Sequence, residues 1–163
     1  MSFRTKLEAL DEKYWHGGKV SIKPIKTMNE LIYAGYECRL TEEQKDMVSP
    51  FWFTIGKAYL FPEDHYPCVI YNERSDAIGF INLCKWSGDE AYSWSFYIDK
   101  AHQGKSYGKA SASLAISILK AVSPDMPIKL STEQSNVKAQ RLYTSLGFIK
   151  SDELDGDDLV YVL

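Results

Sequence analysis

Few residues of the chain are suited to form disulfide bonds or to bind a metal ion. The cysteines are odd in number, widely spaced and without a CxxC pair: Cys38, Cys68 and Cys84. This pattern favours buried free thiols over a disulfide framework or a redox site. The histidines are equally scattered, and no two of them have metal-ligand spacing: His16, His65 and His102. We therefore expect neither a metal site nor a redox centre.

The sequence also lacks a long apolar run and a surplus of positive charge. No apolar run approaches the ~20 residues that span a bilayer, and the start MSFRTKLEAL lacks the apolar core of a signal peptide. Nineteen basic and 22 acidic residues give a net charge of −3 without a basic stripe, which argues against nucleic acid as a partner. We therefore expect a cytoplasmic protein without a membrane partner, and the 163 residues suit one globular domain.

Hydrophobic periodicity predicts helices in the first third of the chain and strands after it. A short amphipathic helix that ends at Gly17-Gly18 follows from the spacing of Phe3, Leu7, Leu10 and Tyr14. Further helices begin where capping-box spacing occurs, at Thr27 with Glu30 and at Thr41 with Gln44. The pattern then predicts a first strand over 20–25, a helix over 47–61, and strands over 67–71, 77–86 and 91–98.

In the second half of the chain, helices alternate with strands. A helix over 108–122 buries one apolar stripe, a strand over 128–132 follows, and Asn136 is the expected N-cap of a helix that ends at Gly147. A final hairpin over 148–163 has a turn at Gly156. Acidic residues gather there, a pattern that favours a solvated turn over a binding patch: Asp152, Glu153, Asp155, Asp157 and Asp158. This order predicts an α/β sandwich with a mainly antiparallel sheet and one parallel crossover.

The stretch from Ala91 to Ala110 reads as a strand, a polar loop and a helix. The first turn of a helix leaves backbone N–H groups unpaired, and Gly104 and Gly108 let that backbone approach an anion such as a pyrophosphate. The nearby Lys105 adds positive charge. The spacing fits neither the P-loop pattern GxxxxGK[ST] nor GxGxxG, so the residues alone leave a phosphate site and a structural turn both open.

Two motifs in this half resemble those of the GNAT superfamily of N-acetyltransferases. HQGKSYGKA resembles the pyrophosphate-loop pattern [QR]-x-x-G-x-[GA], in which Gln103 and Gly108 match and Ser106 stands where glycine is usual. NVKAQRLYTSLGF resembles the pattern N-x-x-A-x-x-L-Y-x-x-x-G-F, matching at Asn136, Ala139, Leu142, Tyr143, Gly147 and Phe148. The resemblance covers residues 20–163 and points to the bacterial spermidine/spermine (diamine) acetyltransferase branch.

The resemblance implies an acyl-CoA N-acyltransferase fold, a mixed, mainly antiparallel sheet flanked by helices on both faces. Residues 1–18 would be an N-terminal helical extension and residues 19–163 the acetyltransferase domain. Acetyl-CoA would be the co-substrate, without a metal ion, and a small-molecule amine the acceptor. Homodimers are common in the family.

Particular site residues are implied by the same resemblance. Backbone groups of Phe96, Tyr97 and Ile98 would pair with the pantetheine arm of the cofactor like an added strand. The pyrophosphate would lie in the loop formed by Gln103, Gly104, Lys105, Ser106, Tyr107, Gly108 and Lys109. Asn136 would contact the cofactor, and Tyr143 would be the catalytic acid.

Acetylation of an amine requires the neutral amine, which for an alkylamine of pKa near 10.4 is about one molecule in 2,500 at pH 7. Relatives often carry a carboxylate as base on the strand before the loop, where this chain has Trp94 and Ser95. Asp89 and Glu90 lie nearby and a water relay is equally consistent, so the base stays open. With an ordinary pKa of ~10, Tyr143 suits a hydrogen-bond donor to the departing thiolate.

At Ser106 we expect a negative φ, with the hydroxyl donating a hydrogen bond to a phosphate oxygen. The favoured function is the transfer of acetyl from acetyl-CoA to a primary amine, by direct attack in a ternary complex. A polyamine is the hypothesised acceptor, and an amino sugar, an antibiotic, a peptide N-terminus and a protein lysine stay open. The alternative is a non-catalytic acyl-CoA-binding module, which the missing carboxylate near Ser95 and the serine in the loop support.

Overall fold

Two antiparallel sheets form the centre of the molecule and meet at one pair of strands. The computed structural model describes residues 1–86 and 90–163. The first sheet has the order β1 (Val20–Pro24), β2 (His65–Asn72), β3 (Ala77–Lys85) and β4 (Tyr92–Ile98). The second has the order β5 (Lys129–Thr132), β7 (Asp158–Val162) and β6 (Ile149–Asp155). A parallel bridge between Tyr92 and Ile128 links the two sheets.

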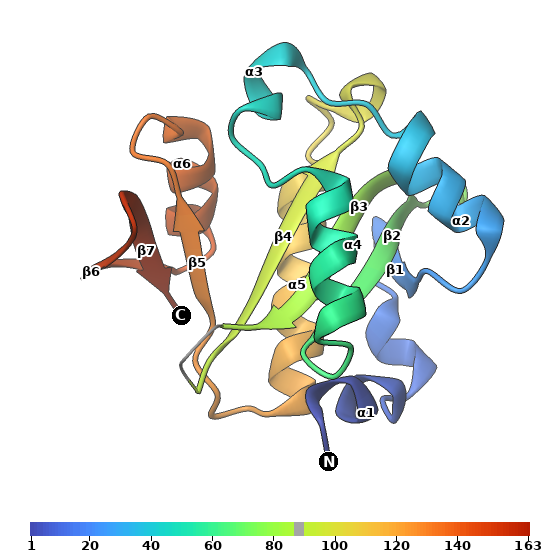
Figure 1. The fold of residues 1–163 in the computed structure, drawn as a ribbon, viewed down its shortest axis with the longest axis horizontal. Coiled ribbons are helices and arrows are strands. Elements are labelled where there is room, and N and C mark those ends of the chain that lie inside the picture. The colour runs from blue at the N-terminus through green and yellow to red at the C-terminus, as the bar shows by residue number, and fades with distance from the viewer. Residues whose placement is uncertain (87–89) are drawn as a thin grey trace.

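Helices cover both faces of the first sheet, as Figure 1 shows. On one face lies α5 (Tyr107–Val122). The other face carries α2 (Met28–Ile32), the π-helical turn η2 (Tyr33–Glu37), α3 (Glu42–Lys45) and α4 (Phe51–Leu60). The remaining helices are α1 (Phe3–Glu8), η1 (Glu12–Trp15), η3 (Lys100–His102) and, beside the second sheet, α6 (Val137–Ser145). The predicted fold class is therefore confirmed. Among the described residues, no helix has both the length and the apolar character that crossing a bilayer requires.

Strand alternation separates the core into two clusters on opposite faces of the first sheet. The larger cluster lies against α5 and includes Cys68 and Ile70 of β2. A smaller cluster lies under η2 and α4, where Phe80 and Tyr97 are packed and Phe51 of α4 meets Phe80 edge-on at 5.0 Å. Because successive side chains point to opposite faces, residues 80, 82 and 84 of β3 and residues 93, 95 and 97 of β4 face α4.

Local signals fixed most element boundaries. Both predicted capping boxes form, at Thr27 with Glu30 and at Thr41 with Gln44. Three helices are shorter than the periodicity predicts. The helix predicted over 47–61 begins only at Phe51, after Pro50, because proline suits a helix start. The helix that follows Thr27 passes into the π-helical turn η2. The first helix ends at Glu8, and the short 3₁₀ helix η1 follows it.

The N-terminal segment contributes directly to the larger core cluster. Phe3 and Leu7 of α1 and Trp15 of η1 are buried there, and Leu7 is fully inaccessible. The Phe3 ring lies 4.8 Å from the ring of Tyr92 at the start of β4. The segment therefore supports the end of β4 at which the two sheets meet.

We predict that Leu7→Ala lowers the free energy of unfolding by about 2–5 kcal/mol, because a fully buried leucine loses its contacts and leaves a cavity. The exposed neighbour Glu8, which forms a surface ion pair with Arg4, provides the control Glu8→Ala. Urea denaturation of both variants measures the difference. Equal midpoints for the two would contradict the assignment of α1 to the core.

Candidate active site

The turn between β4 and α5 is built from left-handed backbone that presents N–H groups. Gly104 has φ 74° and Ser106, the N-cap of α5, has φ 64° and ψ 16°. Left-handed residues in such a turn bring successive N–H groups to one concave side, which favours an anion. The expected negative φ at Ser106 is therefore wrong. The chain uses a serine where the turn requires the conformation that glycine adopts without steric cost.

Gln103 ties this turn to β4 and to α3. Its amide nitrogen donates to the Ile98 carbonyl at 2.9 Å and to Gln44 Oε1 at 2.7 Å. Gln44 already closes the capping box of α3, so the same side chain joins that helix to the turn. The glutamine of the loop motif thus fixes where the turn leaves the strand.

A second group of side chains holds the far half of the turn. Lys19, just before β1, donates from Nζ to the Lys105 carbonyl, and its ammonium lies 5.0 Å from the centroid of the Tyr107 ring. The Tyr107 hydroxyl donates to Glu73 Oε2 at 3.0 Å. Lys19 and Glu73 come from segments distant in sequence, and no local motif indicated either of them. Together they hold the turn in one conformation before any ligand binds.

The edge of β4 next to the second sheet is free over most of its length. Tyr92 N donates to the Pro127 carbonyl at 2.9 Å, so the backbone groups of Tyr92 face β5. By the two-residue period of a strand, those of Trp94, Phe96 and Ile98 face the same way. Within the described residues, β4 has no strand partner on that side beyond the Tyr92–Ile128 bridge. The two strands diverge from there toward α3 and α6 (Figure 1).

The backbone groups of Phe96, Tyr97 and Ile98, all three predicted to bond to the cofactor, do not face the same side of the strand. Phe96 and Ile98 belong to the free edge. Tyr97 pairs with Phe80 of β3 in the continuous ladder, and its backbone groups face that strand. The edge offered to a ligand therefore consists of alternate residues, and the Ile98 carbonyl on it is already bonded to Gln103.

A series of aromatic contacts connects Tyr143 to the same edge of β4. Trp94 of β4 meets Phe148 edge-on at 5.8 Å, and Tyr143 of α6 lies 5.8 Å from Phe148 and 6.0 Å from Tyr161. Burial raises the pKa of Tyr143 to about 12. The hydroxyl therefore stays protonated at neutral pH and is available as a donor.

Asn136 is the N-cap of α6, as predicted, and its Oδ1 accepts from Ala139 N at 3.1 Å. Its amide nitrogen is thereby oriented away from the helix. Lys105 and Lys109 lie on the turn and in the first turn of α5, where both are exposed. They add positive charge beside the N–H groups of the helix start.

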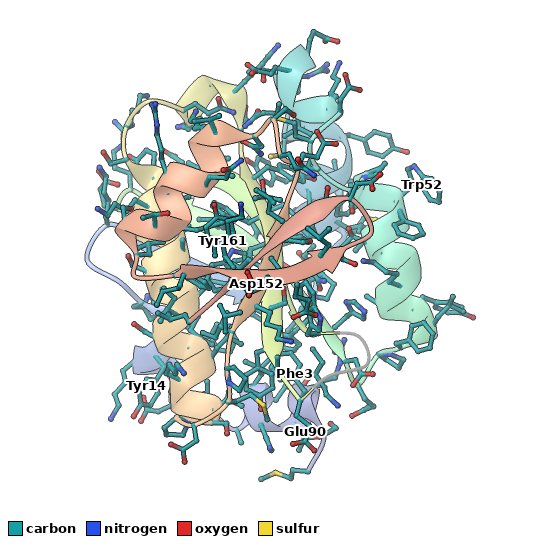
Figure 2. All side chains as sticks on the ribbon, turned by 90° about the vertical axis from the view of Figure 1, so that its left-hand side faces the viewer. Phe3, Tyr14, Trp52, Glu90, Asp152 and Tyr161 are labelled. Atoms are coloured by element: carbon teal, nitrogen blue, oxygen red, sulfur yellow. The ribbon has the colours of Figure 1, made fainter. Side chains whose placement is uncertain are left out.

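Of the carboxylates considered as a base, Asp89 lies outside the described residues. Glu90 is exposed just before β4, and Figure 2 shows it with Phe3 at the N-terminal end of the molecule, away from the glycine turn. Ser95 is exposed in the middle of β4 and faces α4. The described part of β4 thus offers no carboxylate, and the polar groups around Ser95 come from neighbouring strands.

A comparison with protein families covers both sequence motifs. The family model described as the acetyltransferase (GNAT) family matches residues 27–148. The chain belongs to the GNAT family. It is thus an acetyl-CoA-dependent N-acetyltransferase, and the matched residues contain both motifs. None of the curated proteins matches its sequence.

Solved structures show the same fold at low sequence identity. The acetyltransferase from Agrobacterium tumefaciens str. C58 has a TM-score of 0.68 at 14% identity, over 91% of this chain and 92% of that chain. Ribosomal-protein-S5-alanine acetyltransferase from Vibrio fischeri has a TM-score of 0.67 at 14% identity, over 91% and 94%. The dodecameric spermidine N-acetyltransferase from Vibrio cholerae has a TM-score of 0.63 at 15% identity, over 90% and 92%.

The left-handed backbone at Ser106 predicts that Ser106→Gly raises the free energy of unfolding by about 0.5–1 kcal/mol, because glycine avoids the steric cost of a positive φ. Ser75, the other non-glycine residue at φ 64°, lies in the β2–β3 turn and supplies Ser75→Gly as the control. Chemical denaturation should show a similar gain for both. Destabilisation by Ser106→Gly alone would mean that the serine hydroxyl stabilises the turn by more than the backbone strain costs.

Gly108 tests the anion site without strain in the fold. A Cβ added there would meet only Phe96 Cε2, at 4.0 Å, and the backbone does not have a positive φ. We predict that Gly108→Val weakens acetyl-CoA binding at least about tenfold in titration calorimetry, because its methyl groups occupy the approach to the N–H groups. Gly18→Val, also in open space but outside the turn, is the control. Equal affinities for the two variants would remove the turn from the cofactor site.

Proposed function

We propose that the protein transfers the acetyl group of acetyl-CoA to a primary amine by direct attack in a ternary complex. The observation that carries the proposal is the free edge of β4, which runs from the glycine turn at one end to the surroundings of Tyr143 at the other. Both ends have the chemistry that the reaction requires: anion-binding N–H groups, and a protonated phenol.

The pyrophosphate of the cofactor is proposed to lie on the N–H groups of residues 104–109. The pantetheine arm then continues along β4 and bonds to the free edge at Ile98 and Phe96, which are about 7 Å apart along an extended strand. Such pairing adds the arm to the sheet as a further strand. This pairing would bring the thioester beside residues 94–95. Ser95 is exposed there, and Trp94 contacts Phe148, which in turn contacts Tyr143.

Tyr143 is proposed to donate a hydrogen bond to the sulfur as the tetrahedral intermediate expels the thiolate. A pKa of about 12 exceeds that of an ordinary thiol by about 3.5, so complete proton transfer is unfavourable by about 5 kcal/mol. A hydrogen bond from the neutral phenol does not incur that cost. It stabilises the charge that develops on sulfur in the transition state.

A small cationic amine of polyamine type is the proposed acceptor class. The β6–β7 hairpin, on which Figure 2 marks Asp152, carries the acidic segment 152–158. Burial, and then the carboxylates of Glu133, Asp155 and Asp157, raise the pKa of Asp158. Negative charge is thus concentrated where α6 approaches the hairpin, which supports attraction of a polycation. The fold match to a spermidine N-acetyltransferase supports the same class, and the match to a ribosomal-protein acetyltransferase supports a protein acceptor.

An acceptor panel separates the two classes. Coenzyme A release from acetyl-CoA should be faster with spermidine and spermine than with peptides of free N-terminus, and added salt should reduce the advantage. Turnover with peptides and none with polyamines would contradict the polyamine class. A binding module without catalysis, the alternative function, would release no coenzyme A with any amine. A homodimer is proposed on the family resemblance, and the exposed edge strand β6 is the surface proposed for it.

Replacement of the phenol tests the mechanism. We predict that Tyr143→Phe lowers kcat by about 10²–10⁴-fold and changes the affinity for acetyl-CoA by less than about threefold, because only the departing thiolate needs the hydroxyl. Phenylalanine keeps the ring contacts with Phe148 and Tyr161. Steady-state kinetics with calorimetry measures both quantities, and a variant with nearly full turnover would exclude Tyr143 from the chemical step.

A further inference from the structure

A buried polar pair joins β2 and β3 on the face of the sheet that α4 covers. Asn82 Nδ2 lies 2.9 Å from His65 Nδ1. Asn82 is 1% exposed and His65 9% exposed, although the strand around Asn82 is otherwise apolar. Asn82 Oδ1 is buried and accepts no hydrogen bond from any described residue. One side of the amide is therefore held by the histidine, and the other side is unpartnered.

The contact fixes the state of His65. Because an amide N–H donates to Nδ1, the ring nitrogen must carry a lone pair, and the imidazole is neutral. Burial and the nearby ammonium of Lys57 of α4 lower the pKa of His65, while Asp64 opposes this change. The described residues also place two other titratable groups beside His65. The Arg4 guanidinium donates to the His65 carbonyl at 3.2 Å, and Cys84, the partner of His65 across the β2–β3 ladder, has a thiol whose pKa is raised to about 12 by burial. Neutral His65 is thus consistent with the charges that face it.

Asn82 lies directly beside the exposed part of β4. Its partner across the β3–β4 ladder is Ser95, and both side chains face α4. Adjacent strands are about 4.8 Å apart, a distance that an amide side chain spans. The arm proposed to run from Ile98 to Phe96 ends at this point. A buried amide oxygen without a partner carries a large desolvation cost unless a ligand or water donates to it.

From this juxtaposition we infer that Asn82 Oδ1, which is closed to solvent in the unliganded fold, accepts a hydrogen bond from the N–H of the acceptor amine when the amine binds over Ser95. We also infer that His65 is the positioning residue that holds the amide in this orientation. The inference rests on the proposed function. It assigns no carboxylate base: Asn82 orients a neutral amine so that the nitrogen lone pair faces the thioester carbonyl. The amine's proton is then lost from the tetrahedral intermediate to solvent.

The pair also makes recognition sensitive to acid. When His65 is protonated, Nδ1 becomes a donor and requires the amide oxygen, so the Asn82 side chain must turn and present Nδ2 to the amine. Two donors then face each other and binding is lost. A neutral amine is therefore accepted only while His65 is neutral, which holds above the lowered pKa of the histidine and fails below it.

Kinetics of the double variant Asn82→Leu/His65→Phe test the inference. Both polar groups are replaced by apolar groups of similar shape, so no buried group is left unpaired and the fold should be retained. We expect KM for the amine to rise about tenfold, with KM for acetyl-CoA unchanged. Below pH 6.5, the slope of log(kcat/KM) against pH should steepen from 1 toward 2 in the wild-type protein and stay at 1 in the double variant.

Cys68→Ala removes packing on the opposite face of β2 and serves as the control for a loss of stability. It should leave the KM values for the amine and for acetyl-CoA unchanged. A folded double variant whose amine KM and pH slope match those of the wild type would overturn the role of Asn82. A wild-type protein that binds acetyl-CoA and acetylates no amine would instead contradict the proposed function.

Discussion

The arrangement of the molecule depends on one unpaired strand edge. β4 is fully bonded to β3 on one side. On the other side, within residues 1–86 and 90–163, it meets the second sheet only where Tyr92 approaches Pro127 and Ile128. Backbone groups in the interior of a protein require partners. A ligand with alternating donors and acceptors would supply them by extending the sheet, which is the role proposed for the pantetheine arm.

The rest of the fold keeps that edge open and places different side chains on the two faces of β4. Phe3, Leu7 and Trp15 fill the core where the strands meet, and Gln103, Lys19 and Glu73 hold the turn at the other end. Toward α5 the strand faces aliphatic and aromatic side chains. Toward α4 it faces the polar pair of His65 and Asn82. Both faces of the sheet are packed, and the polar pair lies on the α4 face, where we propose that the amine binds.

Much of this fold could be predicted from the sequence because its signals are local. Capping boxes at Thr27 and Thr41 and the N-cap Asn136 act within four residues, and strand alternation needs no distant partner. The backbone at Ser106 was mispredicted because its positive φ is imposed by the turn. Lys19 reaches Lys105 across 86 residues, and Gln103 reaches Gln44 across 59, so no motif could have paired them. Asn82 did carry a signal, as one amide in the apolar strand AIGFINLCK, while His65 gave none.

Residue-resolved hydrogen exchange with and without acetyl-CoA tests the central claim most directly. If the cofactor adds to the free edge of β4, the amides of Phe96 and Ile98 and those of residues 104–109 should exchange more slowly when it is bound. The amide of Tyr97, already committed to β3, should change little by comparison. Protection that leaves Phe96 and Ile98 unaffected and appears at other segments of the chain would contradict the account.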